Sequence, residues 1–243
     1  MNTIKKWWDA KYSQKMLSKQ LGKLMIGAVL SAIILPSSAN AHAEIVAANP
    51  AINSVISKIP NIIKIQANEG VTFEANNFQL LDSMGKVLLS NKSAISSNSI
   101  EVQTSKKYSN GYYVVRYKIE SADGHIVLGS YGFIVGKVKQ AIVKSKDVIL
   151  ESLDVQDESS SSKVLNVKLK PLKDGRVEVS CLGEHLECQI QFTSPRYKAP
   201  FVVSVEVNKS KILVLPPKNT YSLTALLRVS QFKQVYYQGK VSL

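Results

Sequence analysis

From residue 42 onward the sequence repeats one pattern, in which a short run rich in Val, Ile and Tyr is followed by a cluster of turn-forming residues. Such runs favour β-strands, and no segment of this part shows apolar residues at helical spacing. The clearest expected strands are 62–67, 78–82, 86–89, 112–119 and 130–135, followed by 164–169, 176–180, 189–192, 201–207, 212–215, 221–229 and 235–243. The sequence therefore predicts an all-β protein, and the strand spacing of its first part is typical of an immunoglobulin-like β-sandwich.

The first 41 residues have a different character. They hold six lysines and one acid, Asp9, and an apolar run over 24–35 that Pro36 breaks, before an Ala-x-Ala sequence that ends at Ala41. A basic region, an apolar core and this ending are typical of a secretory signal peptide. The apolar run is shorter than the roughly 20 residues that a membrane-spanning helix needs. We expect cleavage after Ala41 and export to the periplasm, cell envelope or exterior; an uncleaved N-terminal anchor is the alternative.

The net charge narrows the classes of partner. The whole chain carries 31 basic and 18 acidic residues, for a formal charge of +13. Without residues 1–41 the counts become 25 and 17, which gives +8. An exported protein of this charge suits a surface of anionic lipid or polymer, so we expect no nucleic-acid partner. No apolar run of membrane length follows residue 41, and we expect no transmembrane segment in the mature chain.

Residues 138–163 interrupt the strand pattern. The segment begins rich in lysine and ends in Asp157-Glu158 followed by four serines and Lys163. Serines beside acids cannot bury a core, so we expect a linker between a first domain, 42–137, and a second β-rich domain, 164–243. A long surface loop within one larger domain is the alternative. We can assign no chemistry to residues 164–243 from their sequence.

Two histidines suggest a metal site. Cleavage after Ala41 would make His42 the first residue, and a free α-amine and ring Nδ1 can chelate one ion together. Nitrogen donors in this arrangement suit Cu(II). Asp123 and His125 lie two residues apart, so in extended chain both side chains point to one face, and both are good Cu(II) ligands. The alternative is a surface histidine beside a common Asp-Gly turn.

Three separated motifs carry a resemblance to a known family. The segment 111–135, which contains Ser121-Ala-Asp123-Gly-His125, resembles the paired strands typical of the CopC copper-resistance family. His42-Ala43 followed by Asn49-Pro50-Ala51 is similar to the start of the mature family members. Residues 63–71 are similar to the strand that ends in an acidic residue. The three motifs occur in consistent order over residues 42–137.

The resemblance implies a copper-binding β-sandwich with a Cu(II) site. Carried over by position, the ligands are His42, Glu69, Asp123 and His125. Around Glu69 the match is weaker, because Ala67 replaces an aromatic residue, Gly70 follows, and Glu74 lies close by. The resemblance also implies a role in copper homeostasis or resistance rather than catalysis, and cooperation with a CopD-type membrane copper transporter. A Met-rich Cu(I) site is not expected, because Met84 is the single methionine after residue 41.

Two further interpretations stay open at this point. Cys181-x3-His185-x2-Cys188 could bind zinc, but a fourth ligand is not evident, and a disulfide-closed hairpin in an oxidising compartment is expected instead. The functional alternatives are a copper-dependent oxidative enzyme that holds its metal through the N-terminal histidine, or an envelope-interaction module with a vestigial copper site.

Overall fold

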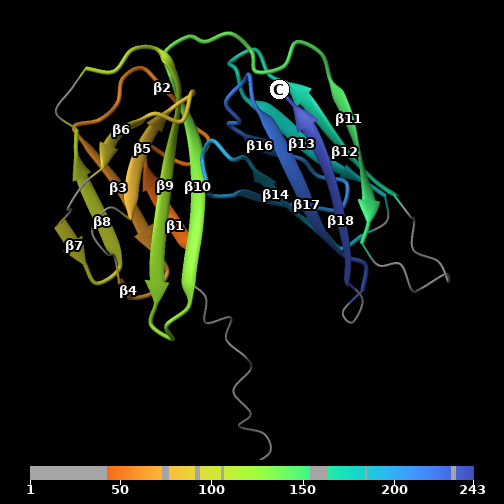
Figure 1. Cartoon of the computed structure of the whole chain (residues 1–243), viewed down its shortest axis with the longest axis horizontal. Helices are drawn as coiled ribbons and strands as arrows, with labels where there is room; N and C mark the ends of the chain where they lie inside the picture. Colours follow the sequence, from red (N-terminus) through yellow and green to blue (C-terminus); the bar gives the residue numbers. More distant parts are fainter. Residues whose placement is uncertain are drawn as a thin grey trace, which may run out of the picture. The chain divides into compact units, whose positions relative to one another are not determined.

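The regular secondary structure of the described residues is entirely β. The computed structural model describes residues 43–72, 77–90, 94–104, 107–153, 164–183, 185–230 and 234–243 (Figure 1). The all-β prediction is confirmed. Within these residues no helix is long and apolar enough to cross a membrane.

The first half contains two sheets. Its strands are β1 (Ile45–Asn49), β2 (Val55–Ile56), β3 (Ile62–Ala67), β4 (Val71–Thr72), β5 (Phe78–Asp82), β6 (Val87–Ser90), β7 (Ala94–Ser96), β8 (Ser99–Gln103), β9 (Gly111–Ser121) and β10 (Ile126–Val135). One sheet has the order β1-β3-β8-β7, and the other runs β10-β9-β5-β6, with β2 on β10 and β4 on β9. In Figure 1, β9 and β10 lie side by side as the long hairpin of the second sheet.

Alternation along the strands explains why the two sheets pack face to face. In β3, Ile63 and Ile65 are buried and lie between more exposed neighbours. In β9, Tyr113 and Val115 belong to the same hydrophobic cluster as these isoleucines. Because side chains of a strand alternate between faces, each sheet presents one apolar surface to the other. The first half is therefore a β-sandwich.

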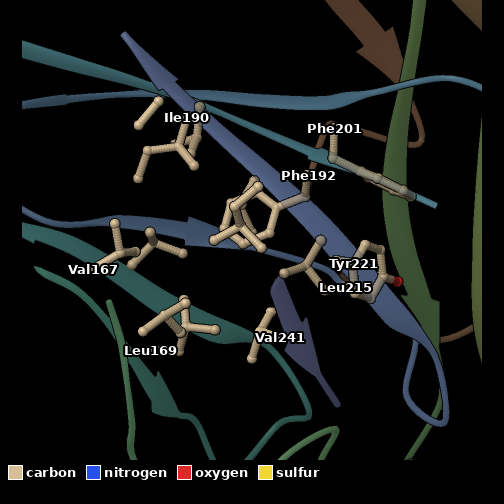
Figure 2. Packing of buried hydrophobic residues seen from close by; sticks show 14 of the residues in the cluster. Val167, Leu169, Ile190, Phe192, Phe201, Leu215, Tyr221 and Val241 are labelled. Carbon is tan, nitrogen blue, oxygen red and sulfur yellow. The ribbon is translucent and has the colours of Figure 1, made fainter. Parts of the chain in front are cut away.

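The second half is built from the remaining strands. These are β11 (Lys146–Ser152), β12 (Val164–Pro171), β13 (Val177–Leu182), β14 (Glu187–Thr193), β15 (Phe201–Glu206), β16 (Lys211–Leu213), β17 (Thr220–Arg228) and β18 (Gln234–Ser242). They follow the order β16-β13-β12-β11-β18-β17-β14-β15. Figure 2 shows Val167 and Leu169 of β12 on the opposite side of the core from Phe192 of β14 and Tyr221 of β17. The strands thus curl around one apolar core.

The strand β11 lies inside the segment that the sequence predicted to be a linker. Val148 and Leu150 are buried in the second core, whereas Ile149 between them is exposed. Three consecutive apolar residues beside lysines hide this alternation in the sequence, which is why the strand was not expected. The serine-rich part of the predicted linker, 154–163, lies outside the described residues.

The two halves share a continuous sheet. β10 and β15 pair in parallel where Ser130 faces Phe201, and the Ser130 N–H donates to Pro200 O over 2.9 Å. Leu81 and Val114, which belong to strands of the first half, are 1% and 0% exposed and pack within the second core. The described residues accordingly belong to one compact unit.

Hydrogen bonds also join the first and second halves of the chain. The Tyr112 hydroxyl donates to Gly175 O over 2.9 Å. The Asn53 N–H donates to Gly132 O over 2.9 Å, and Asn53 Oδ1 accepts from the Val214 N–H over the same distance. A Cβ added to Gly132 would lie 2.4 Å from Val214 O, so β10 and the chain after β16 approach more closely than any larger residue would permit.

Candidate metal centre

A tight turn between β9 and β10 places Asp123 and His125. Gly124 has a φ of +83°, which suits a residue without a Cβ. The Gly124 N–H donates to Ser121 O, and the Ser121 N–H donates to His125 O, each over 2.9 Å. From the sequence, the two side chains were expected to point to the same face because residues two apart do so in an extended chain. That reason is wrong, since residues 122–124 form the turn itself, and the turn brings the side chains together instead.

The two side chains are in direct contact. His125 Nδ1 lies 2.8 Å from Asp123 Oδ2, and the imidazole and carboxylate side chains are 64% and 33% exposed. The Ser121 hydroxyl donates to Asp123 Oδ1, and the His125 N–H donates to the same oxygen over 3.3 Å. The Ser121 hydroxyl, with a further contribution from His125, lowers the pKa of Asp123 to about 2. Asp123 is therefore an ionised, oriented carboxylate beside an accessible imidazole.

Sequence reasoning did not identify Ser121 as part of this site. Its hydroxyl contacts Asp123 and also donates to His125 O over 3.0 Å. A serine two residues before an aspartate at the end of a strand is a weak signal for such a turn, because Ser and Asp side chains often bond to nearby backbone. The residue fixes the orientation of the pair without being a predicted ligand.

Glu69 lies in the segment that joins β3 to β4. Ala67 at the end of β3 pairs with Ile45 of β1, and Val71 of β4 pairs with Ser121 of β9. This pairing brings the segment to the end of the sandwich where the β9–β10 turn lies. Glu69 Oε1 is buried and has no hydrogen-bond partner among the described residues. A buried carboxylate oxygen normally has a partner, so this one is suited to an additional ligand.

The chain that follows His42 is fastened to the same segment. Ala43 is 4% exposed, the Glu44 N–H donates to Asn68 Oδ1, and the Asn68 N–H donates to Glu44 O, each over 2.9 Å. These contacts hold the beginning of β1 next to the residue that precedes Glu69. His42 itself lies outside the described residues, as does Glu74.

The described residues bring together two of the predicted ligands, Asp123 and His125. They contain no group of three His, Cys, Asp or Glu side chains that could share a metal ion. Glu69 is at the same end of the sandwich but is not part of such a group. The complete ligand set with His42 stays a prediction.

Cys181 and Cys188 form a disulfide, with Cα atoms 6.5 Å apart. This confirms the expected hairpin closure and contradicts the zinc interpretation, because both sulfurs are already bonded to each other. His185 between them is 5% exposed, and its Nδ1 lies 2.9 Å from Gly183 O.

Comparison with known proteins agrees with the sequence motifs. Residues 45–136 match the family described as CopC domain. The copper transport protein CutJ of Bacillus subtilis is 30% identical over 112 residues, which are 45% of this chain and 21% of that protein. The chain therefore spans about a fifth of the length of this curated relative.

Two solved structures are also similar. CopC from Methylosinus trichosporium OB3b is 27% identical, with a TM-score of 0.37, over 41% of this chain and 98% of the other. PcoC, a copper resistance protein from Escherichia coli, is 21% identical, with a TM-score of 0.31, over 38% of this chain and 99% of the other. The family match ends at residue 136 and leaves the second half uncovered. Residues 45–136 thus match the CopC domain family, which confirms the resemblance indicated by the motifs of residues 42–137.

Proposed function

We propose that the protein is exported and binds one Cu(II) ion as cargo at the end of its first β-sandwich, in the service of copper homeostasis or resistance. The observation that carries the proposal is the contact of 2.8 Å between Asp123 Oδ2 and His125 Nδ1, within a segment that matches the CopC domain. Imidazole nitrogen and carboxylate oxygen are donors that suit Cu(II).

The spacing of the pair fits this chemistry. With metal–ligand bonds of about 2.0 Å, neighbouring corners of a square-planar site lie about 2.8 Å apart. The two atoms now face each other across a hydrogen-bond distance, so the imidazole and the carboxylate would have to rotate until both face a shared ion, while their separation could stay the same. Because the pKa of Asp123 is lowered to about 2, its carboxylate is ionised at any physiological pH and needs no deprotonation to bind.

The remaining proposed ligands come from the N-terminus and from Glu69. If export removes residues 1–41, His42 contributes its α-amine and ring nitrogen. The hydrogen bonds between Glu44 and Asn68 support this, because they hold the start of the chain beside Glu69. The buried, unpartnered Glu69 Oε1 supports a place for this carboxylate at the ion or at a group bound to it.

We infer a carrier rather than an enzyme. The relatives are named for copper transport and copper resistance. A site with several carboxylates also crowds the metal and leaves little room for oxygen. The proposed partner is a CopD-type membrane copper transporter, to which the protein delivers copper or from which it receives it.

Copper titration of the protein that begins at His42, followed by electron paramagnetic resonance, tests the proposal. We expect one Cu(II) per chain, and a loss of affinity of tenfold or more in both His125→Ala and Asp123→Asn. Glu120→Gln is the matched control, since Glu120 is an exposed carboxylate next to Ser121 that is not a proposed ligand. Unchanged affinity in both ligand variants would refute the site. Reductant-dependent peroxide formation by the copper-loaded protein would instead favour the oxidative enzyme.

A further inference from the structure

Residues 164–243 carry most of the net positive charge of residues 42–243. Residues 164–243 contain 12 basic and 5 acidic residues, a net charge of +7, whereas residues 42–243 together carry 25 and 17, or +8. Residues 42–163 thus have 13 basic and 12 acidic residues, a net charge of +1, and the excess of positive charge lies in the part of the chain that the family match does not cover.

Most acidic residues of the segment 164–243 form ion pairs, whereas Asp147 and Glu151 of β11 form none among the described residues. Four of the five lie in the described residues, and each forms an ion pair with a nearby basic side chain. The pairs are Asp174–Arg176, Glu178–Lys170, Glu187–Arg228 and Glu206–Lys209. No ion pair joins Arg196 or Lys218 to an acidic group within the described part of the chain. These two cations therefore retain their full charge for an external anion.

Arg196 and Lys218 line the same open cleft, which has a volume of about 520 Å³. Asn219, Thr220 and Ser242 also line it and contribute amide and hydroxyl groups, and Leu243 contributes a carboxylate that accepts from the Asn219 N–H over 3.1 Å. A third cation is close, because Lys146 Nζ donates to Ser242 O. Two cations in the lining and a third beside it outnumber the carboxylate of Leu243, so the surface keeps a positive potential suited to an oxyanion.

The walls of the cleft are held in place by the ends of β17 and β18. Thr220 pairs with Ser242, and their hydroxyl oxygens are 3.0 Å apart. The Asn219 side-chain amide donates to Ser194 Oγ over 2.8 Å. Arg196 is fixed from the other side, since its Nη1 donates to Ser83 O over 3.0 Å. Arg196 and the polar walls are therefore oriented before any ligand arrives, which reduces the entropy cost of binding.

The backbone of Lys218 is unusual. Its φ of +56° lies in the left-handed region, which costs a residue other than Gly or Asn free energy. Lys198 has the same φ of +56° and does not line the cleft, so this conformation does not itself mark a ligand site. It provides a second lysine with equal backbone strain for comparison.

We propose that this cleft binds a phosphate-type oxyanion, with the Arg196 guanidinium and the Lys218 ammonium as its charged contacts and Lys146 as an additional source of positive potential. A planar guanidinium can donate two parallel hydrogen bonds to phosphate oxygens, and an ammonium adds a point charge. The anion is free phosphate or the headgroup of an anionic phospholipid, and the latter would hold the copper-binding half at a membrane surface. This site is separate from the proposed copper site.

The test uses the protein that begins at His42, with inorganic phosphate and phosphatidylglycerol vesicles as probes. Lys218→Asn removes the charge and leaves a residue that tolerates the same backbone conformation. Lys198→Asn is the matched control, because Lys198 also has a φ of +56° and is exposed but does not line the cleft. We expect Lys218→Asn to weaken phosphate binding by about threefold or more at low salt while its melting temperature is maintained or raised, and Lys198→Asn to have the smaller effect.

The vesicle experiment identifies the source of the anion. Cosedimentation with phosphatidylglycerol but not phosphatidylcholine vesicles, reduced by Lys218→Asn, supports a lipid headgroup. Phosphate binding without cosedimentation supports free phosphate. Equal losses in Lys218→Asn and Lys198→Asn would show that net charge alone is responsible and would overturn the cleft. The absence of binding to either probe at low salt would also overturn it. Copper affinity should be the same in both variants.

Discussion

The close approach of Gly132 to Val214 offers a direct test of how the two halves are joined. A Cβ at position 132 would lie 2.4 Å from Val214 O, 2.7 Å from Val214 Cγ1 and 2.8 Å from Val214 Cβ. The first obstacle is a backbone atom that cannot rotate away. Gly132→Ala must therefore displace the chain after β16, and with it the hydrogen bond from the Val214 N–H to Asn53 Oδ1.

The magnitude follows from these contacts. Forcing extra volume into a packed region costs about 1–3 kcal/mol, and the loss of one hydrogen bond costs about 1 kcal/mol. Alanine lowers the entropy of the unfolded chain, which returns about 0.4–1 kcal/mol. Together these contributions lower the free energy of unfolding by about 1–3.5 kcal/mol, with a central value of about 2 kcal/mol. At a urea m-value of about 2 kcal/mol/M, the midpoint should fall by about 1 M.

Urea unfolding followed by far-ultraviolet circular dichroism measures this shift. Gly70→Ala is the control, because the nearest atom to an added Cβ there is Ser97 O at 3.5 Å, an ordinary contact distance. Its midpoint should change little, by less than about 0.5 M. If Gly132→Ala and Gly70→Ala unfold at the same urea concentration, Val214 does not lie against β10 in solution and the reasoning fails.

Four other predictions concern the copper site and the disulfide. Copper affinity should fall as pH drops from about 8 to 6, because protons compete for amine and imidazole, whereas the carboxylate of Asp123 with its lowered pKa contributes no change above about pH 4; titrations at several pH values check this. Because that pKa is depressed to about 2, the stabilisation from Asp123 is present above its unfolded pKa of about 3.9 and is lost as pH falls toward 2. In acid unfolding measurements, Asp123→Asn should lack this loss of stability between about pH 4 and pH 2. One extra residue before His42 should weaken Cu(II) binding nearly as much as His42→Ala, with Glu69→Gln the mildest of the ligand changes, and an unchanged resonance spectrum in the extended protein would contradict the chelate. Replacing both Cys181 and Cys188 by serine should lower the free energy of unfolding by about 2 kcal/mol, because the closed loop is short; a denaturant midpoint equal to that of the unaltered protein would count against it.

The strands whose bounds the sequence predicted best are those with clear turn-forming residues on both sides. β3 and β5 have the predicted bounds, 62–67 and 78–82, and Asp82 ends β5 by accepting from backbone N–H groups of the following turn. β10 begins at Ile126 rather than at residue 130, because its pairing with β9 continues to the turn that contains Asp123. Where pairing with a neighbouring strand sets the end of a strand, local composition does not predict that end.

The candidate site was predictable to the extent that it is local. Asp123 and His125 occur in one motif and meet in one turn, so their pairing follows from neighbouring residues. The position of Glu69 depends on the register between β4 and β9, which no local pattern specifies. The junction between the halves was unpredictable for the same reason: Tyr112 and Gly175 are 63 residues apart in sequence and meet only in the folded chain.

The strand β9 contributes side chains to an apolar core on each of its two faces. Tyr113 and Val115 face the first core, while Val114, together with Leu81 of β5, is buried in the second. Removal of the second half would therefore present Val114 and Leu81 to water, and that face of the sheet would become an apolar patch on residues 42–137.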